Sequence, residues 1–154
     1  MKNNVTNRVI STNRKASFNF EILKTYEAGI ELKGTEVKSL RKFNVNIKDG
    51  YCIIEKGEIY INNMYISPYK EGNVFNSDPL RKRKLLMHKK EILKLFDFVK
   101  QKGFSIIPIS LYFNKSKIKI KIGLCKGKKI YDKRQTIIKK EIDRKIERNL
   151  KNRY

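Results

Sequence analysis

Two stretches of the chain alternate apolar and polar residues, and this pattern restricts both to half-buried β-strands. Between residues 18 and 32 the even positions are apolar except for Lys24, and between 117 and 124 the even positions are Ile or Leu. Successive side chains of a strand point to opposite faces. Each stretch is therefore expected to have one core face, and the lysines at 117, 119 and 121 are expected to share an outer face.

Further strands are predicted from turn signals. Lys56-Gly57 separates two short apolar runs within residues 51–62, and residues 114–116 separate residues 104–113 from the lysine-bearing strand. Both patterns are typical of hairpins. Residues 65–69 suggest one more strand, and the turn-rich residues 70–79 suggest a surface loop.

Helices are predicted at two places. Thr35 is a candidate N-cap for a short helix over residues 36–42, and a helical apolar spacing over residues 88–102 ends at Gly103. Asp78-Pro79 is interpreted as an N-cap followed by a first-turn proline. About six antiparallel strands with few helices predict a mainly β fold, α+β by content. We expect a small closed barrel of the OB type, because closure removes exposed strand edges, with two or three flanking helices and a basic tail.

The charge of the chain predicts a polyanionic partner. The 154 residues hold 37 Lys and Arg against 15 Asp and Glu, a net charge of +22. An AT-rich genome also enriches Lys, Ile and Asn, and would account for part of this excess. It does not account for the arginines, which include Arg81 and Arg83.

The C-terminal segment, residues 126–154, is the most basic part of the chain, with twelve Lys or Arg against four acids. Ile138, Ile142, Ile146 and Leu150 recur every four residues and would form one stripe on a helix. So short and charged a segment buries too little surface to fold alone. We expect a flexible basic arm over residues 1–12, a folded domain over 13–125, and a tail that becomes helical only on a polyanion.

The residue types disfavour an enzyme, a metal site or a membrane protein. His88 is the one histidine, Cys52 and Cys125 lack a partner motif and are expected to be buried free thiols, and no cofactor motif is found. No apolar run reaches the roughly 18–20 residues of a membrane span, and the N-terminus lacks a signal peptide's apolar stretch. We therefore expect a cytoplasmic protein without catalysis or cofactors.

Basic clusters favour nucleic acid. They are residues 13–15, residues 81–84 and the lysines at 117, 119 and 121. Each cluster alone is as well explained as a solvated face, but together they are typical of phosphate binding. Glu27 lies on the outward phase of its strand, where an acid either aids solubility or accepts hydrogen bonds from base amino groups.

Five strings resemble the SsrA-binding protein (small protein B) family. They are NRKA at 13–16, YEAGIELKGTEVKSLR at 26–41, ISPY at 66–69, DPLRKRKLL at 78–86 and KGKKIYDKR at 126–134. The resemblance covers nearly all of residues 13–150. It implies a non-catalytic OB-type barrel that binds the tRNA-like domain of transfer-messenger RNA and brings it to stalled ribosomes. It also implies a tail that enters the empty mRNA channel as a helix, near the small-subunit decoding centre.

The resemblance also implies site residues. With the basic run at 81–84, the RNA-binding set is Asn13, Arg14, Lys15, Glu27, Arg81, Arg83, Lys84 and Leu86. The ribosomal set in the tail is Gly127, Lys128, Lys129, Tyr131, Asp132, Lys133, Arg134 and Ile142. Three positions depart from the family pattern: Phe43 replaces a glycine after the first helix, and Tyr65 and Ser77 each replace a histidine. The free protein is expected to be a monomer.

Two other classes stay open. A ribosomal or ribosome-associated protein that binds rRNA stably would share the charge and the barrel. An RNA-processing enzyme is disfavoured, because no cluster of His or carboxylate residues is evident.

Overall fold

The structure is a computed structural model that describes residues 8–70, 78–101, 103–128 and 130–151, and the side chains of 130–132 are not among the described parts. The predictions for residues 1–7, for Ser77 and most of the loop at 70–79, and for Lys129 lie outside the described residues.

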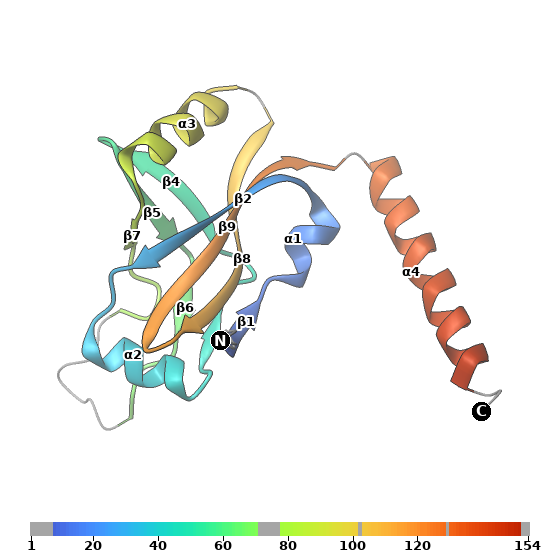
Figure 1. The fold of residues 1–154 in the computed structure, drawn as a ribbon, viewed down its shortest axis with the longest axis horizontal. Helices are drawn as coiled ribbons and strands as arrows, with labels where there is room; N and C mark the ends of the chain where they lie inside the picture. Colours follow the sequence, from blue (N-terminus) through green and yellow to red (C-terminus); the bar gives the residue numbers. More distant parts are fainter. Residues whose placement is uncertain (1–7, 71–77, 102, 129, 152–154) are drawn as a thin grey trace, which may run out of the picture.

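The chain is an α+β protein with mostly β-strands, as predicted (Figure 1). The strands are β1 (Arg8–Thr12), β2 (Phe20–Ile30), β3 (Val45–Asn46), β4 (Tyr51–Glu55), β5 (Glu58–Asn62), β6 (Tyr65–Ile66), β7 (Arg83–Leu86), β8 (Phe104–Asn114) and β9 (Lys117–Gly127). The helices are α1 (Arg14–Asn19), α2 (Gly34–Arg41), α3 (Lys89–Val99) and α4 (Ile130–Lys151).

Seven strands form one antiparallel sheet in the order β1-β8-β4-β5-β7-β2-β9, and β9 also pairs with β8. The two predicted hairpins are confirmed as β4–β5 and β8–β9. In the β8–β9 ladder Ile120 lies opposite Leu111, and on its other side opposite Ala28 of β2. All three side chains are buried, so the predicted core face of β9 is confirmed.

The core lies between the inner face of this sheet and the helices α2 and α3. Fully buried members include Leu40 of α2, Leu85 of β7, Leu95 of α3 and Ile120 of β9. Burying side chains of this size stabilises the fold by roughly 1.5–3 kcal/mol each. Cys52 and Cys125 are buried and free, as predicted.

The N-terminal region differs from the prediction. Residues 8–12, expected in a flexible arm, form β1 and pair with β8. Residues 14–19 form α1, so the strand expected from Phe18 begins at Phe20. The alternation of Phe18 and Phe20 is equally compatible with a short helix that ends between them.

Two predicted helix starts are also corrected. Asp78-Pro79 begins a turn and no helix: the Asp78 carboxylate accepts a hydrogen bond from the Leu80 N–H at 2.9 Å, and strand β7 follows. The N-cap of α2 is Lys33, not Thr35. The Glu36 carboxylate accepts a hydrogen bond from the Lys33 N–H at 2.9 Å, so the helix begins two residues earlier than a Thr35 cap would place it.

The tail is helical over Ile130–Lys151 and extends from the β domain as α4 (Figure 1). Its root contacts α1: the Lys128 N–H donates to Asn19 O at 2.9 Å, and the Lys128 ammonium donates to Ser17 O at 2.9 Å and to Thr136 Oγ1 at 3.1 Å. The disorder expected for the tail in the free protein stays a prediction. Among the described residues, no helix is long and apolar enough to cross a membrane.

Candidate nucleic-acid interface

A cationic face lies on the outer side of the ladder β8–β9–β2. On β9, Lys121 lies opposite Glu27 of β2, and Lys119 lies opposite Gly29 of β2 and Tyr112 of β8. Because alternate residues share a face, the two lysines flank the Glu27 carboxylate on the solvent side. The predicted outer position of Lys119 and Lys121 is therefore confirmed, and Glu27 lies on the same face.

A cavity of about 590 Å³ opens beside this face and gathers three of the predicted RNA-binding residues, Glu27, Lys84 and Leu86. Its other lining residues are Gly29, Glu58, Leu85, Met87, His88, Lys89, Glu91 and Lys119. The Leu86 side chain is 54% exposed, which leaves an apolar surface for a base to pack on. The Lys84 ammonium lies 3.6 Å from a Glu58 carboxylate oxygen, a partly exposed pair that contributes little stability and can be exchanged for a phosphate contact.

A second hollow, of about 320 Å³, lies at α1 and includes Asn13, Lys15 and Asp49 in its lining. Arg14 and Lys15 are exposed, and the Lys15 ammonium lies 3.7 Å from the Asp49 carboxylate. Both cations are accessible to phosphates, and the exposed pair of Lys15 with Asp49 can be exchanged for a phosphate contact.

Asn13 has a structural role in the free protein, and its role in RNA binding stays a prediction. It is 3% exposed, its amide donates to Pro108 O at 2.9 Å, and its carbonyl oxygen accepts the Ala16 N–H at 3.2 Å. The side chain thus caps α1 and attaches it to β8. Its polar atoms are directed into the protein.

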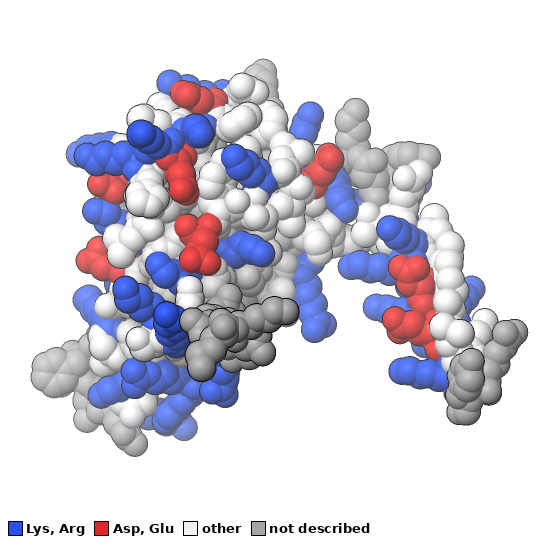
Figure 2. All heavy atoms as spheres, in the orientation of Figure 1, with Lys and Arg blue, Asp and Glu red and all other residues white. Residues whose placement is uncertain are grey.

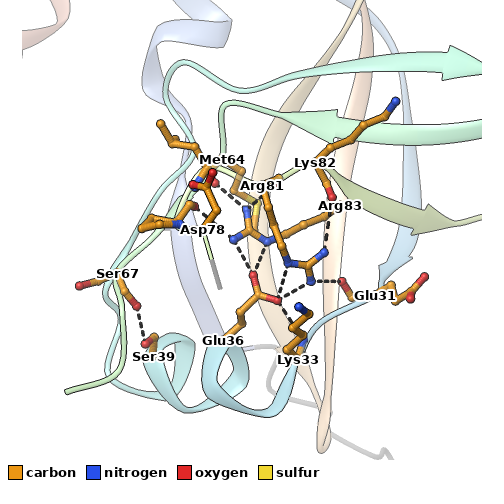
Figure 3. Close-up of polar contacts among 12 residues, drawn as sticks. Glu31, Lys33, Glu36, Ser39, Met64, Ser67, Asp78, Arg81, Lys82 and Arg83 are labelled. Carbon is orange, nitrogen blue, oxygen red and sulfur yellow. Dashed lines mark hydrogen bonds and ion pairs between the residues drawn. The ribbon is translucent and has the colours of Figure 1, made fainter. Parts of the chain in front are cut away.

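Arg83 also has a structural role, and its role in RNA binding likewise stays a prediction (Figure 3). Its side chain is fully buried, its Nε donates to Glu36 Oε2 at 2.5 Å, and Nη1 donates to Met64 O at 2.7 Å. The guanidinium is thus occupied by protein partners in the structure. Arg81 also bonds to Glu36, with Nε donating to Oε1 at 3.1 Å, but its side chain is 23% exposed.

The Glu36 site shows how charge is stabilised inside the fold. Burial alone would raise the pKa of Glu36, but hydrogen bonds from Arg81 and the Lys33 backbone and the charge of Arg83 lower it below its ordinary value. Burial lowers the pKa of Arg83, against the opposing effect of Glu36. The pair connects α2 to β7 and holds the strand that carries Lys84 and Leu86.

The predicted ribosomal residues lie at the junction of β9 and α4. Gly127 ends β9, Lys128 bonds to α1, and Tyr131 and Asp132 lie in the first turn of α4. Lys133 is half-buried, Arg134 is exposed, and Ile142 is 52% exposed in the apolar stripe of α4. Figure 2 shows Lys and Arg on both the β domain and the helix, with an uncharged stripe along one side of the helix.

Sequence reasoning missed Tyr112, whereas its interpretation of His88 as a cap or solvent-facing residue is confirmed. Tyr112 is buried on β8, and its hydroxyl donates a hydrogen bond to Glu27 Oε2. The two residues are 85 positions apart, so nothing local indicates the contact. His88, interpreted as a cap or solvent-facing residue, lies at the N-cap position of α3 without a side-chain cap bond and lines the cavity.

An antiparallel β domain with cationic faces, exposed apolar side chains and a basic helix defines a class of small nucleic-acid-binding proteins. A family model described as SmpB protein matches residues 10–152. The chain belongs to the SmpB protein family.

Known relatives are similar in sequence to this chain over nearly its whole length. An SsrA-binding protein of Clostridium tetani is 51% identical over 148 residues, covering 96% of this chain and 95% of that protein. An SsrA-binding protein of Carboxydothermus hydrogenoformans is 52% identical over 147 residues, covering 96% and 99%. A solved structure described as "tmRNA-SmpB: a journey to the center of the bacterial ribosome" is 50% identical, with a TM-score of 0.66, over 78% of this chain and 85% of that one.

Proposed function

We propose that this protein is an RNA-binding adaptor that binds the tRNA-like domain of transfer-messenger RNA and delivers it to stalled ribosomes in trans-translation. The match to the SmpB family over residues 10–152 carries the proposal, because it includes both the β domain and the tail. The cationic face and the adjacent cavity supply a surface of the required chemistry.

The β domain binds the folded RNA through phosphates and through a few base contacts. Lys84, Lys119 and Lys121 with Arg14 and Lys15 hold phosphates, which gives affinity and a strong dependence on salt. Glu27 and Leu86 contact bases. The pairing of β8 with both β4 and β9 supports a closed OB-type barrel as the rigid platform.

The tail acts at the ribosome. The basic residues of the segment after β9 bind rRNA near the decoding centre, and α4 occupies the mRNA channel when that channel is empty. The stripe of Ile138, Ile142, Ile146 and Leu150 supports this role, because its side chains are exposed and do not pack against the β domain. A tail that folds only in the channel loses its ordering entropy there, which makes it a sensor for a missing mRNA.

The adaptor carries out no catalysis, is monomeric when free and acts in the cytoplasm, where the ribosomes are. A protein that binds rRNA stably is the alternative, and a binding experiment separates the two. We would titrate the tRNA-like domain of transfer-messenger RNA and an unrelated hairpin of equal length at about 0.15–0.2 M salt, where counterion release weakens nonspecific binding. A preference of about a hundredfold for the tRNA-like domain supports the adaptor. Equal binding of both RNAs would contradict it.

A further inference from the structure

Tyr112 reaches across one strand to contact Glu27. Tyr112 lies on β8 and Glu27 on β2, and β9 separates the two strands. The Tyr112 side chain is 7% exposed, yet its hydroxyl donates to Glu27 Oε2 at the surface. The ring is therefore held by packing while its polar end reaches the cationic face.

The carboxylate of Glu27 has a neutral partner although lysines surround it. Lys121 lies directly opposite in the ladder and Lys119 lies two residues along, but among the described residues no ion pair joins Glu27 to a lysine. A phenol fixes the carboxylate rotamer without neutralising its charge. Within the described part of the chain, Oε1 of Glu27 receives no protein hydrogen bond, so it is free to accept one from a ligand.

The phenol is a donor throughout the physiological pH range. Burial, and then the hydrogen bond to Glu27 and its negative charge, raise the pKa of Tyr112 above the ordinary value. The direction of the hydrogen bond is thus fixed, with the hydroxyl donating and the carboxylate accepting.

A carboxylate on an RNA-binding face selects the chemistry of its ligand. It repels phosphates and accepts hydrogen bonds from N–H groups, which RNA offers on the edges of unpaired bases. A carboxylate with a fixed rotamer loses less conformational entropy on binding such an edge than a mobile one.

We propose that Tyr112 is a positioning residue, which orients the Glu27 carboxylate to accept a hydrogen bond from the amino group of an unpaired base. This proposal rests on the proposed function, because it assigns a role within the same RNA-binding face. The ligand is a base edge with an exocyclic amino group, and the lysines beside it bind the flanking phosphates.

The first test measures the affinity of the full-length protein for the tRNA-like domain RNA. Tyr112→Phe removes the hydroxyl and keeps the ring. We expect affinity to fall about 3- to 10-fold, because the Glu27 side chain is then mobile and must be ordered when RNA binds. The slope of log affinity against log salt stays unchanged, because no cation is removed. Tyr60→Phe, on β5, is the matched control and leaves affinity unchanged. A Tyr112→Phe affinity equal to that of the unmodified protein would overturn the proposal.

The second test separates positioning from packing. We expect Tyr112→Phe to have no further effect in a Glu27→Gln background, because the hydroxyl acts only through the carboxylate. An equal loss in both backgrounds would overturn the proposal. The melting temperature of Tyr112→Phe checks that the fold is intact.

The third test identifies the base edge. Unpaired guanosines are replaced one at a time by inosine, unpaired adenosines by purine riboside and unpaired cytidines by uridine, and each replacement removes the exocyclic amino group. One replacement is expected to weaken binding by the unmodified protein and to have a smaller effect on Glu27→Gln and on Tyr112→Phe. If every replacement affects the three proteins equally, base recognition by Glu27 is overturned. If the unmodified protein shows no preference for the tRNA-like domain over an unrelated hairpin, the proposed function itself fails, independently of Tyr112.

Discussion

Arg83 of β7 and Glu36 of α2 form an ion pair from which water is almost excluded. The Nε of Arg83 donates to Glu36 Oε2 at 2.5 Å, and the two side chains are 0% and 5% exposed. Nη1 donates to the backbone oxygens of Met64 and Arg81, at 2.7 and 3.2 Å, and Nη2 donates to Pro79 O at 3.2 Å. Arg83 thereby connects Glu36 in the first turn of α2, Met64 in the turn after β5 and Pro79 in the segment before β7.

Removal of the Glu36 carboxylate should be strongly destabilising. Glu36→Ala leaves the Arg83 charge buried and uncompensated, and we expect the free energy of unfolding to fall by about 3–5 kcal/mol. Glu58→Ala is the control, because Glu58 faces Lys84 at the surface, and its loss should stay within about 1 kcal/mol. Urea denaturation measures both. Equal losses for the two variants would contradict the structural role of the buried pair.

The Glu36 carboxylate should make the melting temperature of the protein depend on pH. Its pKa in the folded state lies below the ordinary value of 4.5, so its ionised form stabilises the fold above about that pH. As pH falls from 4.5 through the folded pKa, the carboxylate takes up a proton and this contribution is lost. We expect the difference in melting temperature between the unmodified protein and Glu36→Gln to be constant near pH 7 and to shrink below pH 4.5. A difference that grew on acidification would show that the pKa is raised instead.

Phe43 should be a strained position at the end of α2. Its φ is +60°, the left-handed region that favours glycine, and the Asn44 N–H bonds to Ser39 O at 3.1 Å in the helix-ending motif that requires this conformation. The strain costs about 1–2 kcal/mol, and the Arg8 guanidinium, 4.7 Å from the ring centroid, offsets about 0.5–1 kcal/mol of it.

Phe43→Gly should therefore raise the free energy of unfolding, by about 1 kcal/mol in an Arg8→Ala background and by less with Arg8 present. Lys42→Gly, where φ is −92°, is the control and should lower it. Chemical denaturation of the four variants checks this. A loss of stability for Phe43→Gly in the Arg8→Ala background would show that the position carries no strain.

Truncation after Arg134 should separate RNA binding from ribosome rescue. The proposed RNA contacts lie on α1, β2, β7 and β9, all before the truncation, so affinity for the tRNA-like domain should stay within about threefold of the full-length value. Peptide tagging on ribosomes stalled without a stop codon should be abolished in a reconstituted translation system. Equal loss of both activities would contradict the division between the β domain and the tail.

The apolar stripe of α4 should be required for tail function. Ile142→Asp with Ile146→Asp removes two side chains that are each 52% exposed, and we expect rescue to fall at least tenfold with no change in RNA affinity. Gln135→Glu with Asn149→Asp makes the same change in net charge outside the stripe and serves as the control. Full rescue by the isoleucine double variant would show that the tail does not work as an amphipathic helix.

The hairpins and the outer lysine face could be predicted because their signals are local. The alternation in β9 and the Lys56-Gly57 turn each lie within a few residues of the structure they define. The resemblance added Glu27, Lys84 and Leu86, which the structure gathers at one cavity.

The buried contacts of Asn13 and Arg83 depend on partners that are far away in the sequence. Arg83 meets Glu36 across 47 residues, and Asn13 meets Pro108 across 95. The periodicity of the sequence cannot reveal contacts over such separations. An arginine in a basic run is also more often exposed than buried. One signal was available for Arg83: it shares its strand face with the buried Leu85, two residues along.

The double attachment of Lys128 makes the tail a lever arm. Its backbone N–H and its ammonium both bond to α1, so the root of α4 is attached to the β domain. A helix of 22 residues is about 33 Å long, and a rotation of about 10° at the root displaces its far end by about 6 Å. Small adjustments at Asn19 and Ser17, on the helix that also carries Arg14 and Lys15, would therefore change the direction of the tail. In such a molecule, the position of the proposed RNA contacts on α1 and the direction of α4 would both depend on the same junction.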